Sequence, residues 1–166
     1  MNEKICYLDL DGTIHAAEVF HSRDFGIRMM TKGRALFEWV PILVELLAAH
    51  PDVLIVLSTT SVAEFGLEFT KDALPDELAR RIIGSTYTPE NLRFFDAWPR
   101  GRQVTSDVQK RKPSHWLAID DDPAGWPPGW ADHLVLTDGA TGISTTAAQN
   151  KIRDILNSWP KQSNLI

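Results

Sequence analysis

Two aspartates separated by one residue, Asp9 and Asp11, follow an apolar stretch of strand length and are followed at once by Gly12. An aspartate carboxylate can attack a phosphoryl group and carry it as an aspartyl-phosphate. A second carboxyl group just past the strand can give a proton to the leaving oxygen and later activate water. The simpler alternative is a turn that ends a strand, because Asp-Gly is a common turn pair. Polar groups elsewhere in the chain favour the catalytic interpretation.

Polar side chains also follow two later apolar stretches. Ser58 and Thr59 follow one of them and could bind a phosphoryl oxygen, while Asp120 and Asp121 follow another. Because the carboxyl ends of parallel strands meet at one edge of a sheet, we expect these groups to lie near Asp9. Four carboxylates at one edge repel each other unless a cation lies among them, and oxygen ligands favour a hard cation such as Mg²⁺. The acids therefore predict Mg²⁺ and a phosphate, although a solvated turn remains the alternative for the later pair.

The elements that would position these groups alternate along the chain. We expect strands at 4–10, 53–57, 81–84, 116–119 and 133–136. We expect helices at 41–50, at 62–74 with a capping box from Ser61 to Glu64, at 102–111 and at 145–158. Residues 14–35 lack periodicity and are interpreted as a loop or hairpin flap over the site. This alternation predicts a three-layer, Rossmann-like α/β fold with a mostly parallel five-stranded sheet.

Length and composition limit the class of protein. The 166 residues suit one domain, predicted over 1–159 with a frayed tail at 160–166. The net charge of −5 argues against binding to long nucleic acid, which prefers a basic surface. The single cysteine, Cys6, is expected to be a small buried hydrophobic residue. The first residues leave no room for a signal peptide and no apolar run is long enough to span a membrane, so a cytoplasmic protein is expected.

With these features, the chain resembles the haloacid dehalogenase-like (HAD) superfamily. The run from Asp9 to Thr13 is similar to the first motif of that superfamily, and the strand that ends in Ser58 is similar to the second. The strand that ends in Asp120 and Asp121 is similar to the fourth. Within the superfamily, the chain looks like the small HAD domain associated with RNA-repair proteins, on the stretches 9–12, 41–53, 116–122, 134–138 and 141–142.

This resemblance implies a role for each residue of the motifs. Asp9 would be the nucleophile and an Mg²⁺ ligand, and Asp11 would be the acid and base, with its backbone carbonyl on Mg²⁺. Asp120 and Asp121 would bind Mg²⁺ directly or through water. The residues expected to bind the substrate are Gly12, Thr13, Ser58, Thr59 and Arg102.

The third motif of the superfamily is a Lys or Arg near the start of the helix before the fourth strand. Arg102 has the most suitable position in the sequence, and Arg100, Lys110 and Lys112 remain alternatives. This cation matters because it would be the charge partner of Asp9.

The resemblance implies a capless, Mg²⁺-dependent phosphohydrolase that cleaves a phosphate monoester through an aspartyl-phosphate. No gap between the expected elements holds a cap domain, so the site would be open. A nucleotide, a nucleic-acid end and another large substrate all remain candidates, and the oligomeric state is open. One alternative is a binding or regulatory module on the same fold with little turnover. A dehalogenase is another, and Asp11 and the later acid pair argue against it because hydrolytic dehalogenation needs neither.

Overall fold

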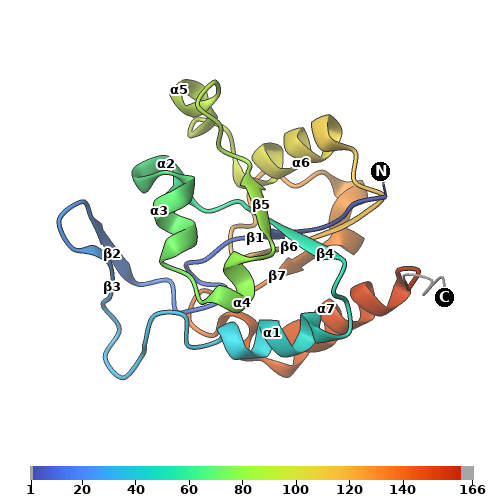
Figure 1. The fold of residues 1–166 in the computed structure, drawn as a ribbon, viewed down its shortest axis with the longest axis horizontal. Helices are drawn as coiled ribbons and strands as arrows, with labels where there is room; N and C mark the ends of the chain where they lie inside the picture. Colours follow the sequence, from blue (N-terminus) through green and yellow to red (C-terminus); the bar gives the residue numbers. More distant parts are fainter. Residues whose placement is uncertain (1, 162–166) are drawn as a thin grey trace.

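The computed structural model describes residues 2–161, and its centre is a five-stranded parallel sheet (Figure 1). The strand order is β5-β4-β1-β6-β7. The strands are β1 (Lys4–Leu8), β4 (Val53–Leu57), β5 (Ile82–Ser85), β6 (His115–Asp120) and β7 (Leu134–Leu136). Because β1 pairs with β4 on one side and with β6 on the other, the carboxyl ends of these three strands are neighbours. The predicted fold class is confirmed.

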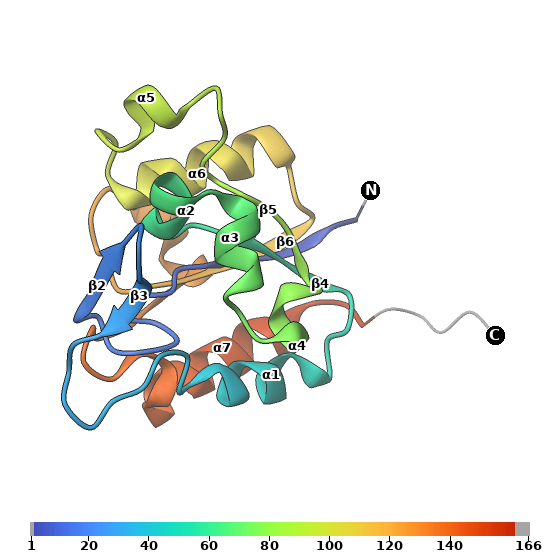
Figure 2. The same cartoon turned by 60° about the vertical axis from the view of Figure 1, so that its left-hand side comes forward.

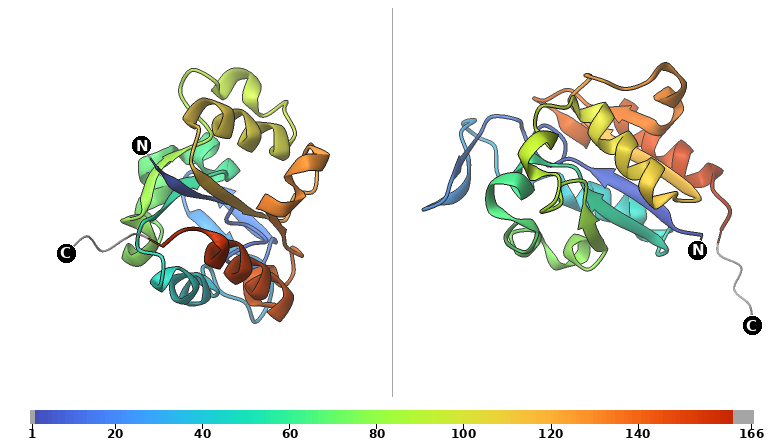
Figure 3. Two further views of the ribbon diagram at one scale, coloured as in Figure 1. Left: turned by 90° about the vertical axis from the view of Figure 1, so that its right-hand side faces the viewer. Right: turned by 90° about the horizontal axis from the view of Figure 1, so that it is seen from above.

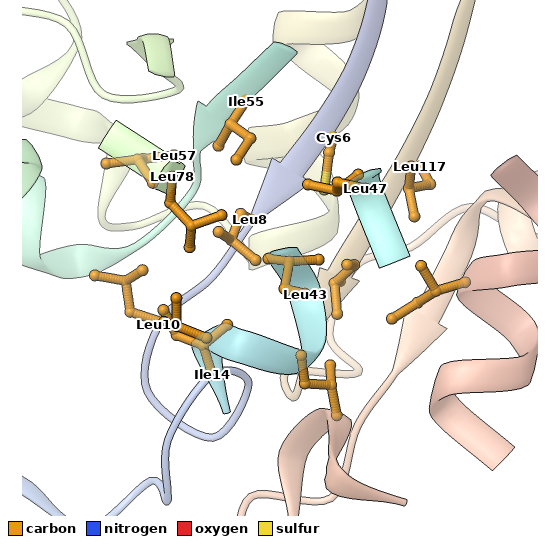
Figure 4. Packing of buried hydrophobic residues seen from close by; sticks show 14 of the residues in the cluster. Cys6, Leu8, Leu10, Ile14, Leu43, Leu47, Ile55, Leu57, Leu78 and Leu117 are labelled. Carbon is orange, nitrogen blue, oxygen red and sulfur yellow. The ribbon is translucent and has the colours of Figure 1, made fainter. Parts of the chain in front are cut away.

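Helices cover both faces of this sheet (Figure 3). The helices are α1 (Val40–Ala48), α2 (Thr60–Phe65), α3 (Leu67–Asp72), α4 (Asp76–Ala79), α5 (Leu92–Phe95), α6 (Arg100–Arg111) and α7 (Thr146–Ser158), with 3₁₀ turns η1 (Pro128–His133) and η2 (Gly142–Ser144). Successive side chains of a strand point to opposite faces, and both faces of β1 are covered, which explains the run of largely apolar residues from Ile5 to Leu8. Cys6 and Leu8 pack with residues of α1 and α7 (Figure 4), whereas Ile5 and Tyr7 pack against Val104 of α6.

The prediction of a single helix at 62–74, capped by Ser61, is wrong in two respects. The segment forms two helices, α2 and α3, because Gly66 between them has a φ of 87° that breaks the helical path. The N-cap is Thr59 and not Ser61: the Thr59 hydroxyl accepts a hydrogen bond from the backbone N–H of Ser61, at 3.3 Å. The sequence pattern displaced the cap by two residues because both positions carry a hydroxyl that can act as a cap.

The segment predicted as a loop or flap contains an antiparallel hairpin, β2 (Val19–Ser22) and β3 (Gly26–Met29), which stands outside the main sheet beside α2 and α3 (Figure 2). Its base is tied to the sheet end by a hydrogen bond from the Ala17 N–H to the Gly139 carbonyl, at 2.8 Å. Among residues 2–161, this hairpin and the short helices α3, α4 and α5 are the additions to the core, and no cap domain is present.

The predicted tail and the expected absence of a membrane span can be compared with the described residues only. Of the predicted tail, residues 162–166 lie outside the described residues. The helices found between residues 2 and 161 are each too short or too polar to cross a bilayer.

Candidate active site

The predicted acids converge at the carboxyl end of the sheet. Asp9 directly follows β1, Asp120 ends the neighbouring strand β6, and Asp121 follows it. One carboxylate oxygen from each of the three lies within 4.8 Å of the others. Asp9 is only 5% exposed and Asp120 is fully buried, so a solvated turn does not describe either residue.

Gly12 allows the loop after β1 to approach the second acidic pair. Its φ is 78°, and a Cβ at this position would lie 2.1 Å from Oδ2 of Asp121. The Thr137 hydroxyl donates to the Gly12 carbonyl at 2.8 Å and so ties this loop to the end of β7. Any side chain at position 12 would displace Asp121, which explains why a glycine ends the acidic motif.

Burial dominates the electrostatics of the acids. The pKa of Asp9 lies well above its usual value, because the carboxyl is buried and because the charges of Asp120, Asp121 and Asp11 are near; Arg100 offsets this only in part. Burial likewise raises the pKa of Asp120 to about 6, again against the opposing effect of Arg100. The pKa of Asp121 is raised by burial too. Together these shifts show that the ionised cluster calls for more positive charge than Arg100 supplies.

Arg100, the first residue of α6, is the cation that faces the nucleophile candidate. Its Nη1 lies 3.1 Å from Oδ1 of Asp9 and 3.0 Å from Oδ2 of Asp120. Burial opposes the charge on Arg100, but the two carboxylates outweigh it and raise the pKa of the guanidinium. The guanidinium therefore stays charged in a position where Asp9 and Asp120 share it.

The preferred assignment of Arg102 to this role is therefore corrected. Arg102 lies over the indole of Trp98, with Cζ 3.8 Å from the ring centroid. Two residues along a helix correspond to a rotation of about 200°, so Arg102 leaves α6 on nearly the opposite side from Arg100. Lys110 and Lys112 are excluded from the role as well, because they lie at the far end of α6, roughly 15 Å away along its axis.

The loop after the acid pair fixes the start of α6. The N–H of Gly101 donates to the carbonyl of Ala124 at 2.9 Å, and a Cβ on Gly101 would lie 2.3 Å from the backbone nitrogen of Trp126. The Trp126 indole N–H donates to the carbonyl of Asp122 at 2.8 Å. Because glycine lets the loop and helix touch, the position of Arg100 depends on the same loop that follows Asp121.

Two histidines surround the carboxylate of Asp11. The Phe37 N–H donates to Nδ1 of His15 at 3.2 Å, which leaves the ring hydrogen on Nε2. Nε2 then donates to Oδ1 of Asp11 at 2.7 Å. Nε2 of His21, from the hairpin, lies 2.9 Å from Oδ2 of Asp11 without the alignment of a hydrogen bond, and its Nδ1 lies 2.5 Å from Oε2 of Glu64 in α2.

Of these histidines, only His15 could be suspected from the sequence, because it lies four residues from Asp11. His21 and Glu64 reach the site through the hairpin and α2 and are part of no spacing pattern around the aspartates. The sequence therefore did not reveal that His21 and Glu64 belong to the site.

The predicted hydroxyl residues separate into two kinds. Ser58 is 1% exposed, and its Oγ has no hydrogen-bond partner within residues 2–161. The Thr13 hydroxyl is equally buried and equally without a partner there. Buried hydroxyls are normally paired, so these two are available to a bound group. The Thr59 hydroxyl, by contrast, is used as the cap of α2.

The cluster of Asp9, Asp120 and Asp121 fits a hard divalent cation. Its donors are all carboxylate oxygens, which Mg²⁺ prefers over nitrogen or sulfur. The raised pKa values of these three carboxyl groups also favour a cation site, since a bound cation would stabilise their ionised forms.

With this geometry established, the comparisons with known proteins identify the family. Residues 5–148 match the family described as HAD domain in Swiss Army Knife RNA repair proteins. The match covers most of the chain, and the chain belongs to this family. A HAD domain indicates a hydrolase of the phosphatase-like kind, and HAD enzymes generally use Mg²⁺. No curated protein and no solved structure matches the chain.

We predict that Asp120→Asn raises the free energy of unfolding of the metal-free protein at pH 8, by about 1 kcal/mol or more. The wild-type carboxyl is ionised there at a desolvation cost that the neutral amide avoids. The gain should shrink as the pH falls through about 6, where the wild-type carboxyl takes up a proton. Urea unfolding in EDTA measures this, with Asp154→Asn on the exposed side of α7 as the control. Destabilisation at pH 8 would contradict it.

Proposed function

We propose that the chain is an Mg²⁺-dependent phosphohydrolase that cleaves phosphate monoesters through an aspartyl-phosphate on Asp9. The observation that carries this proposal is the buried Asp9 carboxylate, which is held by Arg100 and lies with Asp120 and Asp121 in a cluster of oxygens that could hold a metal ion. This arrangement favours turnover over a binding module, because such a module has no need for a cation at the nucleophile. Asp11 and its two histidines support a hydrolysis that requires an acid and a base, unlike a dehalogenation.

The first half of the reaction transfers the phosphoryl group to Asp9. Arg100 holds Oδ1 of Asp9, and the other carboxylate oxygen attacks phosphorus as the bond from phosphorus to the leaving oxygen breaks. The Asp11 carboxyl gives its proton to the leaving oxygen, so the alcohol departs neutral. Asp9, Asp120 and Asp121 would hold Mg²⁺, which when bound would supply positive charge against the phosphoryl oxygens.

The second half returns the enzyme to its starting state. The Asp11 carboxylate takes a proton from water, the water oxygen bonds to phosphorus, and the bond from phosphorus to Asp9 breaks. Inorganic phosphate leaves, with Asp9 ionised and Asp11 protonated again. The Ser58 hydroxyl, which lacks a partner in the described chain, can donate to a phosphoryl oxygen in both halves.

The decisive test is hydrolysis of p-nitrophenyl phosphate with Mg²⁺ by the wild type and by Asp9→Asn. The amide cannot form the phosphoryl intermediate, so we expect activity to fall by at least about a thousandfold. Thermal unfolding of the variant checks that its fold is intact. Absence of turnover of any phosphate monoester by the folded wild type, or full activity of Asp9→Asn, would refute the proposal.

We predict that Arg100→Ala lowers kcat/KM by about a hundredfold or more, whereas Arg102→Ala changes it by less than about threefold. Of these two arginines, Arg100 contacts the nucleophile candidate, whereas Arg102 lies on the Trp98 ring. The two variants remove the same side chain two positions apart on α6, so each controls for the other. Equal losses in both would show that the ion pair with Asp9 is not what matters.

We predict that His21→Asn lowers kcat about tenfold for an alkyl phosphate and much less for p-nitrophenyl phosphate. His21 is a positioning residue for Asp11, and protonation by Asp11 matters most when the leaving alcohol is a poor leaving group. His115→Asn, at the opposite end of β6, is the control. A loss of equal size on both substrates would indicate a structural role for His21 instead.

A further inference from the structure

Arg100 can hold Asp9 only while the first turn of α6 keeps its place. Its Nη1 is shared by two carboxylates, at 3.1 Å from Asp9 and 3.0 Å from Asp120, so a shift of about 1 Å away from them would break both hydrogen bonds. The residue before the helix, Pro99, provides no side-chain cap. The loop that packs on Gly101 holds the helix start from one direction. A side chain of α6 itself holds it from another.

This side chain is that of Gln103, one turn after Arg100 and on the same side of α6, because residues three apart in a helix are neighbours. Side chains of a helix lean toward its N-terminus, so Gln103 reaches back to the segment 95–99 that leads into Arg100. Its Nε2 donates to the carbonyls of Phe95 and Trp98, at 2.8 and 3.2 Å. Gln103 is only 3% exposed, so water competes little for these two bonds.

The amide of Gln103 also meets the chain that follows β5. The Tyr87 hydroxyl is its neighbour, and the Tyr87 ring packs against that of Phe95, with the centroids 5.4 Å apart. Burial raises the pKa of Tyr87 to about 12, so the hydroxyl keeps its proton at neutral pH and can donate to the amide oxygen. Gln103 therefore joins the end of the sheet, the segment before α6 and the first turn of α6.

From these contacts we infer that Gln103 is a positioning residue for the proposed reaction: its amide fixes the segment before α6 and thereby the place of the Arg100 guanidinium beside Asp9. The inference rests on the proposed phosphohydrolase function and adds to it a residue that contacts neither the nucleophile nor the acid cluster. Without the amide, the carbonyls of Phe95 and Trp98 would lose their donor, which is costly inside a protein. The segment would shift to expose them to water and would carry the start of α6 with it.

The first test is Gln103→Leu, which is close in size and removes the donors. We expect kcat for p-nitrophenyl phosphate with Mg²⁺ to fall about tenfold or more, with KM changed less than about threefold, because the displaced arginine holds the nucleophile and not the phosphate. Gln149→Leu is the matched control, since Nε2 of Gln149 donates to the Ser144 carbonyl at 3.1 Å, before and within α7. Equal losses in both variants, or full activity of Gln103→Leu, would overturn the inference.

A double-mutant cycle separates the positioning of Arg100 from a general loss of structure. Arg100→Ala removes the group that Gln103 places, so adding Gln103→Leu to that variant should lower kcat by less than about twofold more. Losses that multiply in the double variant would overturn the inference. If the leucine variant does not fold, Gln103→Asn takes its place with the same expectations, because its shorter amide does not reach both carbonyls.

Crystal structures of the wild type and of Gln103→Leu give a readout that does not depend on turnover. We expect Nη1 of Arg100 to lie beyond hydrogen-bond distance from Asp9 in the variant, with the sheet unchanged. A guanidinium that stays in place would overturn the inference and leave the phosphohydrolase proposal intact. A displaced guanidinium, together with a folded wild type that turns over no phosphate monoester, would support the placement of Arg100 by Gln103 and refute the phosphohydrolase proposal.

Discussion

The site depends on one ion pair, between the buried guanidinium of Arg100 and the carboxylates of Asp9 and Asp120. Burial disfavours the ionised form of both acids, and Arg100 offsets this cost only in part. A half-compensated cluster of this kind is costly to keep in a folded protein, and it is typical of functional sites that bind a cation. The proposed chemistry uses the same imbalance, because a bound metal ion would supply the positive charge that the carboxylates lack.

The rest of the structure holds this ion pair in place from two sides. The sheet supplies the acids, since β1 and β6 are neighbours with parallel register and end at the same level. The loop after Asp121 positions Arg100 indirectly, because it packs against Gly101 and so determines where α6 begins. Gly12 and Gly101 are both required for close approach of backbone segments, one beside the acids and one beside the cation.

A second charged network lies on the outer side of the site, around Asp11. His15 comes from the same loop, whereas His21 comes from the hairpin and also contacts Glu64 of α2. Glu64 also lines a cavity beside the start of α6, so the network around Asp11 extends to that cavity. The hairpin thus takes part in the site, although it is too small to enclose it as a cap domain would.

The sequence by itself determined the fold class and the acids. Uninterrupted apolar stretches of this length are typical of strands buried on both faces, and parallel strands bring their carboxyl ends together, so Asp9, Asp120 and Asp121 had to meet. Ser58 was placed at the same edge by the same reasoning. The tertiary structure alone decided that Arg100 and not Arg102 faces Asp9, because this depends on where α6 begins and on its rotation about its axis. It also decided that Thr59 is a cap and that His21 joins Asp11, since contacts between distant segments leave no trace in local spacing.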